Sequence, residues 1–325
     1  MSMNIALLYC ALFSICVALA SAKSDSKIFF GSKVSSTSGV PYIVAIYNTK
    51  KSGVTCGGML FSTRLVVTAC NCLSYLAIGK KPTRLPLGRF RFIAGESHKD
   101  RMLKDGQVRK TVATYFHPKC ERLEKIIIYD ISIAKMNEVF KITPQVQVLD
   151  IEDWDVDSFR SKAYSMALMN VTCKMAGWGK TASRREENDL KVIAMYLINE
   201  YQCNEIWSLH DPTLKGHSFY QHHQYCTLNS RLMEDTCRGD SGGPYYCGNY
   251  PIGIIQNGFG PCGNLEPTIV TSFSLLIEWW NENDNPVRQE LHKKSGYGRS
   301  RSNPSQTPQA MTLTISLISY FILKR

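Results

Sequence analysis

The sequence has 325 residues, of which 44% are hydrophobic, and a formal net charge of +11. A chain of this length and apolar content can bury a substantial core, so we expect one globular unit with processed ends. The basic residues come as short pairs interleaved with acids, such as Lys50-Lys51 and Lys293-Lys294, a pattern typical of a solvated surface that excludes nucleic acid as an expected partner and leaves only weak attraction to anionic glycans.

Residues 1–22 predict a secretory signal peptide. An uncharged apolar stretch runs from Ile5 to Ala20 and is followed by the small residues Ser21 and Ala22, a pattern typical of a cleavage site. The segment lacks the usual basic head, and a membrane anchor is the alternative. Because the stretch is shorter than the roughly 20 residues that a spanning helix needs, we expect cleavage and a secreted, extracellular protein.

The region from Ile28 to Asn283 predicts an all-β barrel or sandwich, because short β-branched and aromatic runs alternate there with Gly, Pro and Asn. Strands are predicted over 40–47, 89–94, 129–136, 190–198 and 252–256. One helix is predicted over 272–283, with Ser272 as N-cap and one apolar face made of Phe273, Leu276, Ile277 and Trp280.

Five motifs follow one another over about 255 residues. They are Cys56-Gly57-Gly58-Met59-Leu60, Thr68-Ala69-Cys70-Asn71-Cys72, Asp130-Ile131-Ser132-Ile133-Ala134, Gly177-Trp178-Gly179 and Cys237-Arg238-Gly239-Asp240-Ser241-Gly242-Gly243-Pro244. In this order they resemble the chymotrypsin/trypsin family of serine proteases, whose usual forms of the second and fifth motifs are TAAHC and GDSGGP. The resemblance implies two six-stranded antiparallel β-barrels with the active-site cleft between them and a C-terminal helix outside, in a domain over 28–284.

The resemblance also assigns the catalytic positions. It places Asp130 as the acid, Ser241 as the nucleophile, and the N–H groups of Gly239 and Ser241 as the oxyanion hole. Asn71 stands where the family has its histidine base. A carboxamide can donate a hydrogen bond to Asp130 and accept one from the Ser241 hydroxyl. It cannot take up a proton near neutral pH, so it cannot act as the base. Loss of the base costs on the order of 10⁶ in turnover in a related apparatus, so we expect proteolysis to be lost.

None of the seven histidines is expected to replace the missing base. The family places their segments away from the serine, with His222 and His223 the least remote candidates. The complete set is His98, His117, His210, His217, His222, His223 and His292.

The predicted substrate pocket has also changed. Asp235 stands where trypsin-like enzymes keep the carboxylate that binds Lys or Arg. Gly258 is retained in one wall, whereas Thr268 replaces a glycine in the other, and Gln256-Asn257 replaces the usual Ser-Trp. Because the threonine side chain fills part of the slot, we expect Asp235 to be solvated or paired internally.

An activation site is predicted at Lys27-Ile28, after a short propeptide over 23–27. The segment resembles the family's cleavage site, where the new N-terminal amine pairs with the carboxylate that is Asp240 here. Phe30 replaces a glycine, so insertion of the new terminus stays an open question, and processing for assembly is the alternative.

Ten of the twelve cysteines remain after removal of Cys10 and Cys16 with the signal peptide, and secretion favours disulfides among them. The resemblance implies the pairs Cys56–Cys72, Cys173–Cys247, Cys203–Cys226 and Cys237–Cys262. Relatives place the positions of the two remaining residues, Cys70 and Cys120, close to the acid, so we predict an additional bridge between them. No CxxC pair with a matching histidine pair is present, and neither a metal nor a cofactor is expected.

The C-terminal part predicts a polar basic linker over 285–309 and a hydrophobic tail over 310–325. The tail is interpreted as a GPI-attachment signal with Ser295, Ser300 or Ser302 as acceptor, as a short anchor, or as a disordered end. Asn170-Val171-Thr172 is an N-glycosylation pattern.

These features predict a secreted serine-protease homologue that has lost proteolysis and binds extracellular proteins such as proteases, inhibitors or receptors, as a cofactor or decoy. Two alternatives remain. One is a residual or atypical serine endopeptidase of trypsin-like ancestry, and the other is a GPI-tethered cell-surface adhesion module.

Overall fold

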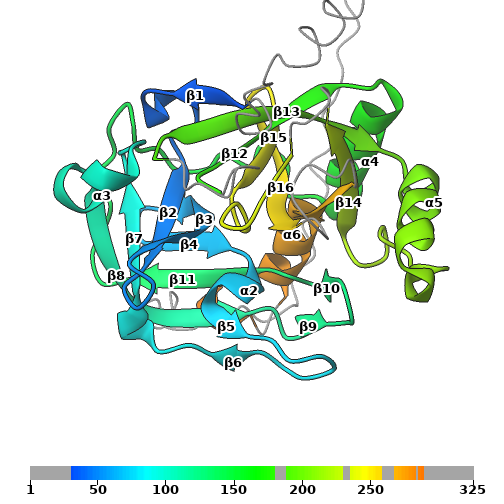
Figure 1. Ribbon diagram of the computed structural model, residues 1–325, viewed down its shortest axis with the longest axis horizontal. Coiled ribbons are helices and arrows are strands. Elements are labelled where there is room, and N and C mark those ends of the chain that lie inside the picture. The colour runs from blue at the N-terminus through cyan, green and yellow to red at the C-terminus, as the bar shows by residue number, and fades with distance from the viewer. Residues whose placement is uncertain (1–30, 180–187, 230–234, 258–266, 283–284, 289–325) are drawn as a thin grey trace, which may run out of the picture.

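The structure, a computed structural model, describes residues 31–179, 188–229, 235–257, 267–282 and 285–288. Two antiparallel β-barrels lie side by side, with helices on the outside of the second barrel (Figure 1). The predicted fold class is confirmed. Among the described residues no helix is both long enough and apolar enough to cross a bilayer.

The first barrel is a closed ring of six strands in the order β11-β4-β3-β2-β7-β8. In chain order these are β2 (Ile43–Asn48), β3 (Gly53–Ser62), β4 (Leu65–Thr68), β7 (Phe90–Ala94), β8 (Gln107–Phe116) and β11 (Ser132–Met136). Its core is made by buried β-branched and aromatic side chains, among them Val44, Ile46, Val66 and Phe92. The pairing of β11 with both β4 and β8 closes the ring, and alternate strand residues fill its interior.

The second barrel has six strands and one added edge strand. Its strands are β12 (Thr172–Gly177), β13 (Leu190–Ile198), β14 (Gln224–Asn229), β15 (Pro244–Cys247), β16 (Tyr250–Asn257) and β17 (Thr268–Ser272). The pairing of β13 with β14 closes the ring. The added strand β1 (Ser32–Val34) pairs with the first residues of β13, Leu190 to Val192. Two short hairpins lie beside the first barrel: β5 (Ser74–Tyr75) with β6 (Thr83–Arg84), and β9 (Glu121–Arg122) with β10 (Ile127–Ile128).

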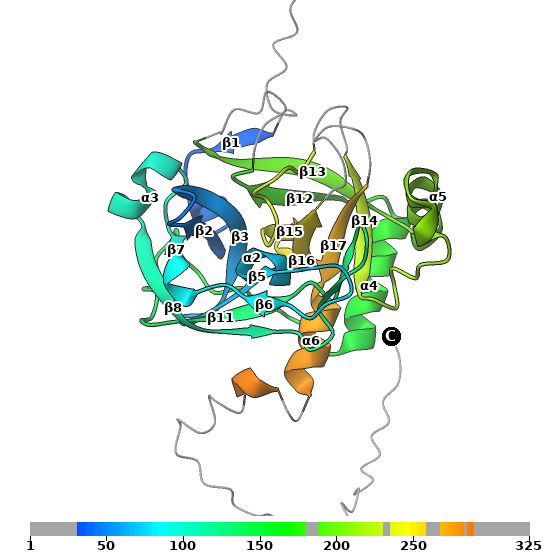
Figure 2. The same cartoon turned by 60° about the horizontal axis from the view of Figure 1, so that its bottom comes forward.

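The predicted C-terminal helix is α6 (Phe273–Asn281). Ser272 caps it as expected, because its hydroxyl accepts a hydrogen bond from Ser274 N at 3.1 Å. The predicted apolar face was too narrow: Leu275 and Trp279 are also fully buried, whereas Trp280 is only partly buried. The helix is enclosed over most of its surface because α4 (Val156–Leu168) packs against it (Figure 2).

The remaining helices were not predicted: α2 (Cys70–Leu73), α3 (Lys99–Asp105), α4 (Val156–Leu168) and α5 (Glu200–His210). In α3, α4 and α5 polar residues dilute the apolar ones, which hides the helical period, and α2 is too short to show one.

Two predicted strands start too early. Val40 to Tyr42 form a turn before β2, and Tyr129 has a φ of +52°, which interrupts the extended chain just before Asp130.

Candidate active site

Sheet pairing brings the acid beside the residue at the base position. β4 pairs with β11 in a register that sets Thr68 opposite Ser132. Asn71 follows β4 in the first turn of α2, and Asp130 comes two residues before β11 starts. The Ser132 hydroxyl ties the two segments together by donating to Ala69 O at 3.2 Å.

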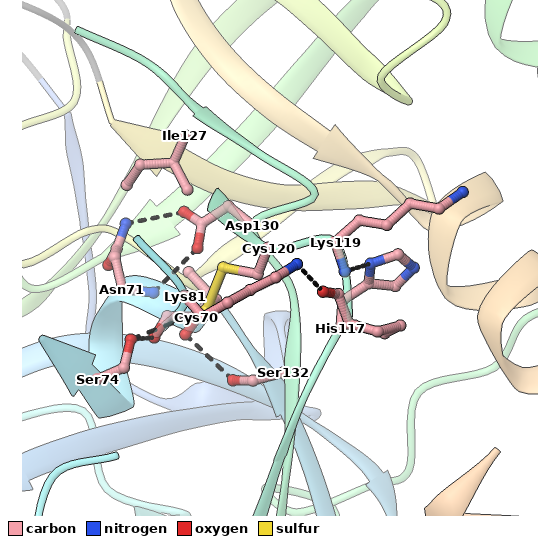
Figure 3. Close-up of a disulfide and its surroundings, with 12 residues drawn as sticks. Cys70, Asn71, Ser74, Lys81, His117, Lys119, Cys120, Ile127, Asp130 and Ser132 are labelled. Carbon is pink, nitrogen blue, oxygen red and sulfur yellow. Dashed lines mark hydrogen bonds between the residues drawn. A yellow bond between two sulfur atoms is a disulfide. The ribbon is translucent and has the colours of Figure 1, made fainter. Parts of the chain in front are cut away.

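Asn71 makes two hydrogen bonds to the Asp130 carboxylate (Figure 3). Its side-chain Nδ2 donates to Oδ2 at 2.8 Å and its backbone N donates to Oδ1 at 2.9 Å. The expected contact between carboxamide and acid is therefore present. Both partners of Asp130 in this contact are neutral groups.

Asp130 is completely buried, and burial raises the pKa of its carboxyl to about 7. Hydrogen bonds from Asn71 and from the Cys70 backbone lower the pKa, but they do not offset the desolvation. An imidazolium in the place of Asn71 would bring a positive charge to this carboxylate. The carboxamide brings none, so no positive charge in this contact offsets the desolvation that raises the pKa of Asp130.

Ser241 lies in a loop that packs backbone against backbone onto the first barrel. Its carbonyl accepts from Gly57 N at 2.9 Å, and Gly242 N donates to Ile255 O at 2.7 Å. Gly242 has a φ of +81°, and a Cβ there would overlap the Thr68 hydroxyl and the Gly57 carbonyl. Among the hydrogen bonds of the described chain, none joins the Ser241 hydroxyl to the Asn71 carboxamide.

The loop that would form the oxyanion hole is anchored through Asp240. The Asp240 carboxylate accepts hydrogen bonds from Gly179 N at 2.7 Å and from Cys237 N at 2.9 Å, and burial raises its pKa. A Cβ at Gly177 or Gly179 would overlap this carboxylate, which explains both glycines of that motif. Gly239 next to it has a φ of +109°. The predicted activation residues Lys27 and Ile28 lie outside the described residues.

Asp235 is paired internally, in agreement with one of the two expected outcomes. Its Oδ1 accepts from Thr236 N at 2.7 Å and from the Thr268 hydroxyl at 3.4 Å. Thr268 is fully buried, and its Oγ1 lies 2.9 Å from the Thr236 hydroxyl. The cavity that adjoins Asp235 has a volume of only about 30 Å³, room for about one water molecule. Gly258 lies outside the described residues.

A pair of glutamines crosses the space between the two barrels, and sequence reasoning missed this link. Gln224 on β14 donates through Nε2 to Ile127 O of β10 at 2.9 Å and to Gln256 Oε1 at 3.0 Å. Gln256 Nε2 donates to the same Ile127 carbonyl. Gln256 was already recognised as replacing a serine, whereas nothing in the sequence marks Gln224. We call these three residues the glutamine latch.

Comparison with known proteins decides the family. The profile of the Trypsin family matches residues 28–280. The chain belongs to the trypsin family.

Its relatives are distant in sequence. The chain is 24% identical to kallikrein-10 of Homo sapiens over 251 residues, 74% of this chain and 78% of the relative. It is 23% identical to chymase of Canis lupus familiaris over 279 residues, 85% of this chain and 97% of the relative. A solved structure of human heparin binding protein covers 77% of this chain and 94% of its own with a TM-score of 0.56 and 20% identity, a likeness of fold alone.

Three histidines of this trypsin-family chain, His117, His222 and His223, make contacts with residues other than Asp130. His117 stacks on Tyr129 with ring centroids 5.2 Å apart. His222 Nδ1 lies 2.7 Å from Ser218 O, and His223 Nδ1 lies 2.9 Å from the Ser274 hydroxyl. Burial, with nearby cations, lowers the pKa of His117 to about 4 and that of His223 to about 3. His210 has no described side chain, and His292 lies outside the described residues.

Four of the five predicted disulfides are confirmed: Cys56–Cys72, Cys70–Cys120, Cys173–Cys247 and Cys203–Cys226. Cys237 is disulfide-bonded, and its predicted partner Cys262 lies outside the described residues. The sulfurs of Cys70 and Cys120 lie close to the Asp130 carboxylate, but the disulfide leaves no thiolate there for a metal. The bridge holds the backbone next to Asn71 against the loop before the acid (Figure 3).

Asn170, in the predicted glycosylation site, is exposed with a φ of +49°. Glycosylation stays a prediction.

Proposed function

We propose that this trypsin-family chain does not cleave peptides and acts by binding extracellular proteins, as a cofactor for active proteases or a decoy for their inhibitors. One observation carries the proposal: the residue that contacts the acid is Asn71, held by two hydrogen bonds to Asp130. An amide cannot take the proton of Ser241 at neutral pH, so the serine stays a weak nucleophile.

The cleft supports the proposal independently of the base. The glutamine latch joins β14 and β16 of the second barrel to β10, and both of its glutamine side chains are buried. Asp235 accepts hydrogen bonds from Thr236 N and from the Thr268 hydroxyl, so a basic substrate side chain would have to compete with these internal partners. A substrate would have to displace these buried hydrogen bonds before any chemistry began.

The disulfides support an extracellular location. Bridges of this number form and persist in oxidising compartments and are rare in the cytosol. The proposed signal peptide over 1–22 fits this location. Tethering through 310–325 remains a separate proposal, tested by release of the protein from cells with a GPI-specific phospholipase.

The proposal is tested by labelling the purified, secreted protein with a fluorophosphonate probe and by incubating it with a peptide library. The Ser241→Ala variant, prepared identically, controls for contaminating enzymes. We expect labelling and cleavage of the parent protein to equal those of Ser241→Ala. Cleavage at rates typical of active relatives, lost in Ser241→Ala, would establish the atypical endopeptidase instead.

The partner is then identified by affinity capture: the extracellular fluid in which the protein occurs is passed over the immobilised protein, and the retained proteins are identified. We expect an active protease or a protease inhibitor to be retained, and to be lost when the protein is denatured before coupling.

A further inference from the structure

A pocket of about 310 Å³ lies on the second barrel between helices α4 and α5. Both helices lie at the outer edge of this barrel in Figures 1 and 2. The strands β13 and β14 and the Cys203–Cys226 disulfide complete the lining. Only Gln224 is shared between this pocket and the glutamine latch. None of Asn71, Asp130, Asp235 or Ser241 contributes to it.

The pocket is built by the sequence of α4. Arg160, Ala163, Tyr164 and Ala167 follow one another at helical spacing, so they share the face that lines the pocket. The two alanines leave space that larger side chains would fill. Phe159, on the face of α4 that does not line the pocket, fixes the helix by stacking on Tyr250, with ring centroids 5.4 Å apart.

Most of the remaining lining is apolar. The pocket includes Leu197, Ile198 and Phe219 together with the rings of Tyr164, Tyr220 and Tyr225. A cavity of this size with an apolar lining and a few polar groups matches the low end of small-ligand sites. Such a lining favours a ligand of one or two rings, or an aliphatic body of similar bulk.

The lining of the pocket holds one cation, Arg160, and one acid, Glu200. The Arg160 guanidinium lies over the Tyr220 ring at 4.9 Å, and its Nη2 lies 2.9 Å from His223 Nε2. His223 is neutral because burial, and next Arg160 itself, lower its pKa to about 3. Among the described residues no carboxylate pairs with Arg160.

One oxygen of the one acid in the lining already has protein partners. Glu200 Oε1 accepts from the Ser218 hydroxyl at 2.9 Å and from Tyr220 N at 3.0 Å. Glu200 also lies in the first turn of α5, where the helix dipole favours a negative charge. Glu278 contacts His223 at 3.1 Å and does not line the pocket. Arg160 is thus the charged group of the lining whose protein contacts are a ring and an imidazole, whereas Glu200 already accepts hydrogen bonds from protein donors.

We propose that the α4–α5 pocket binds a small apolar carboxylic acid, with the ring or aliphatic body among the tyrosines and alanines and the carboxylate on Arg160. An arginine that faces an apolar pocket recognises a planar carboxylate through paired N–H donors. This site works by binding alone, so its test does not depend on whether the cleft cleaves peptides.

The probe is 2-naphthylacetate, titrated calorimetrically into the full secreted chain. We expect saturable binding, and at least tenfold weaker binding of the neutral 2-naphthylacetamide. Arg160→Gln should weaken 2-naphthylacetate binding by about tenfold or more, since a charge-assisted pair is lost. Arg122→Gln is the matched control, because Arg122 is exposed on β9 and does not line the pocket; its affinity should equal that of the parent protein.

A second variant, Ala167→Phe, should abolish binding by filling the space without changing charge. Its thermal unfolding is measured beside that of Arg160→Gln, so that loss of binding is not confused with loss of folding. Equal affinity of parent and Arg160→Gln, tighter binding of the cation 2-naphthylmethylamine, or no saturable heat would each overturn the proposal.

Discussion

The two walls of the cleft have changed to very different degrees. The nucleophile loop of the second barrel keeps the GDSGGP motif, and its Gly239 and Gly242 have positive φ. The opposite wall, in the first barrel, carries Asn71 at the base position and an added disulfide from Cys70. The difference teaches that the motif around Ser241 has a structural reason to exist apart from catalysis, because its glycines permit close contact between the barrels.

That structural reason predicts the largest effect. In Gly242→Ala the new Cβ would overlap the Thr68 hydroxyl and the Gly57 carbonyl, and the residue would keep a φ of +81°. We expect a loss of more than about 3 kcal/mol in the free energy of unfolding, or failure to be secreted. Urea unfolding measures it.

Gly248→Ala is the matched control. Gly248 also has a positive φ of +60°, but a Cβ there meets nothing within 4 Å. This variant should lose only about 1 kcal/mol. If both variants were equally stable, close contact between the barrels would not explain the motif.

The Cys70–Cys120 disulfide predicts the next largest effect on stability, in the wall of the cleft that belongs to the first barrel. Cys70 and Cys120 are separated by 50 residues and both are fully buried. The chain-entropy model gives about 4 kcal/mol for a loop of this length, and measured values are typically 2–4 kcal/mol. The double variant Cys70→Ala/Cys120→Ala should therefore lose about 2–4 kcal/mol in unfolding by urea.

Thiol titration of the unreduced parent protein checks the same bridge directly. We expect no reactive sulfhydryl from Cys70 or Cys120 after denaturation without reductant. Two free thiols in that experiment would show that Cys70 and Cys120 are not joined by a disulfide.

Asp130 predicts a pH dependence of stability. Burial raises its folded-state pKa from 3.8 to about 7, so between these values the folded protein binds more protons than the unfolded chain. The contribution of Asp130 to stability is therefore present below pH 4 and is lost as the pH rises to about 7. Between pH 5 and pH 8 this amounts to about 2–3 kcal/mol.

The variant Asp130→Asn removes this titration. We expect its stability, relative to the parent protein, to increase by about that amount from pH 5 to pH 8, as measured by urea unfolding. Asp105→Asn, at an exposed position of α3, is the control and should follow the parent at both pH values. A constant difference between Asp130→Asn and the parent would contradict the raised pKa.

Sequence reasoning reached the parts of this site that local motifs encode. The order of the motifs predicted two barrels, and the leftover cysteines predicted the Cys70–Cys120 bridge, which the structure contains. The contact of Asn71 with Asp130 followed from the chemistry of a carboxamide beside an acid.

Contacts between distant segments could not be predicted in this way. Gln224 reaches Ile127 across 97 positions of sequence, and neither residue belongs to a motif. Helices α4 and α5 were missed because their polar residues hide the apolar period, and the α4–α5 pocket was missed with them. Such features are set by how the barrels and helices pack, which a residue pattern along one segment does not contain.

Restoring the base separates the two proposed causes of inactivity and is the smallest expected effect. In Asn71→His the imidazole would meet the Asp130 carboxylate and could take the Ser241 proton. We expect fluorophosphonate labelling to rise by about tenfold, equivalent to about 1.4 kcal/mol in the barrier, because this probe needs little of the cleft. Peptide cleavage should stay at the level of Ser241→Ala, since the glutamine latch still crosses the cleft. Adding Gln256→Ser removes one arm of the latch, and only this double variant should show cleavage. If Asn71→His alone cleaved peptides, the missing histidine would by itself explain the lack of cleavage, and the glutamine latch would not obstruct substrates.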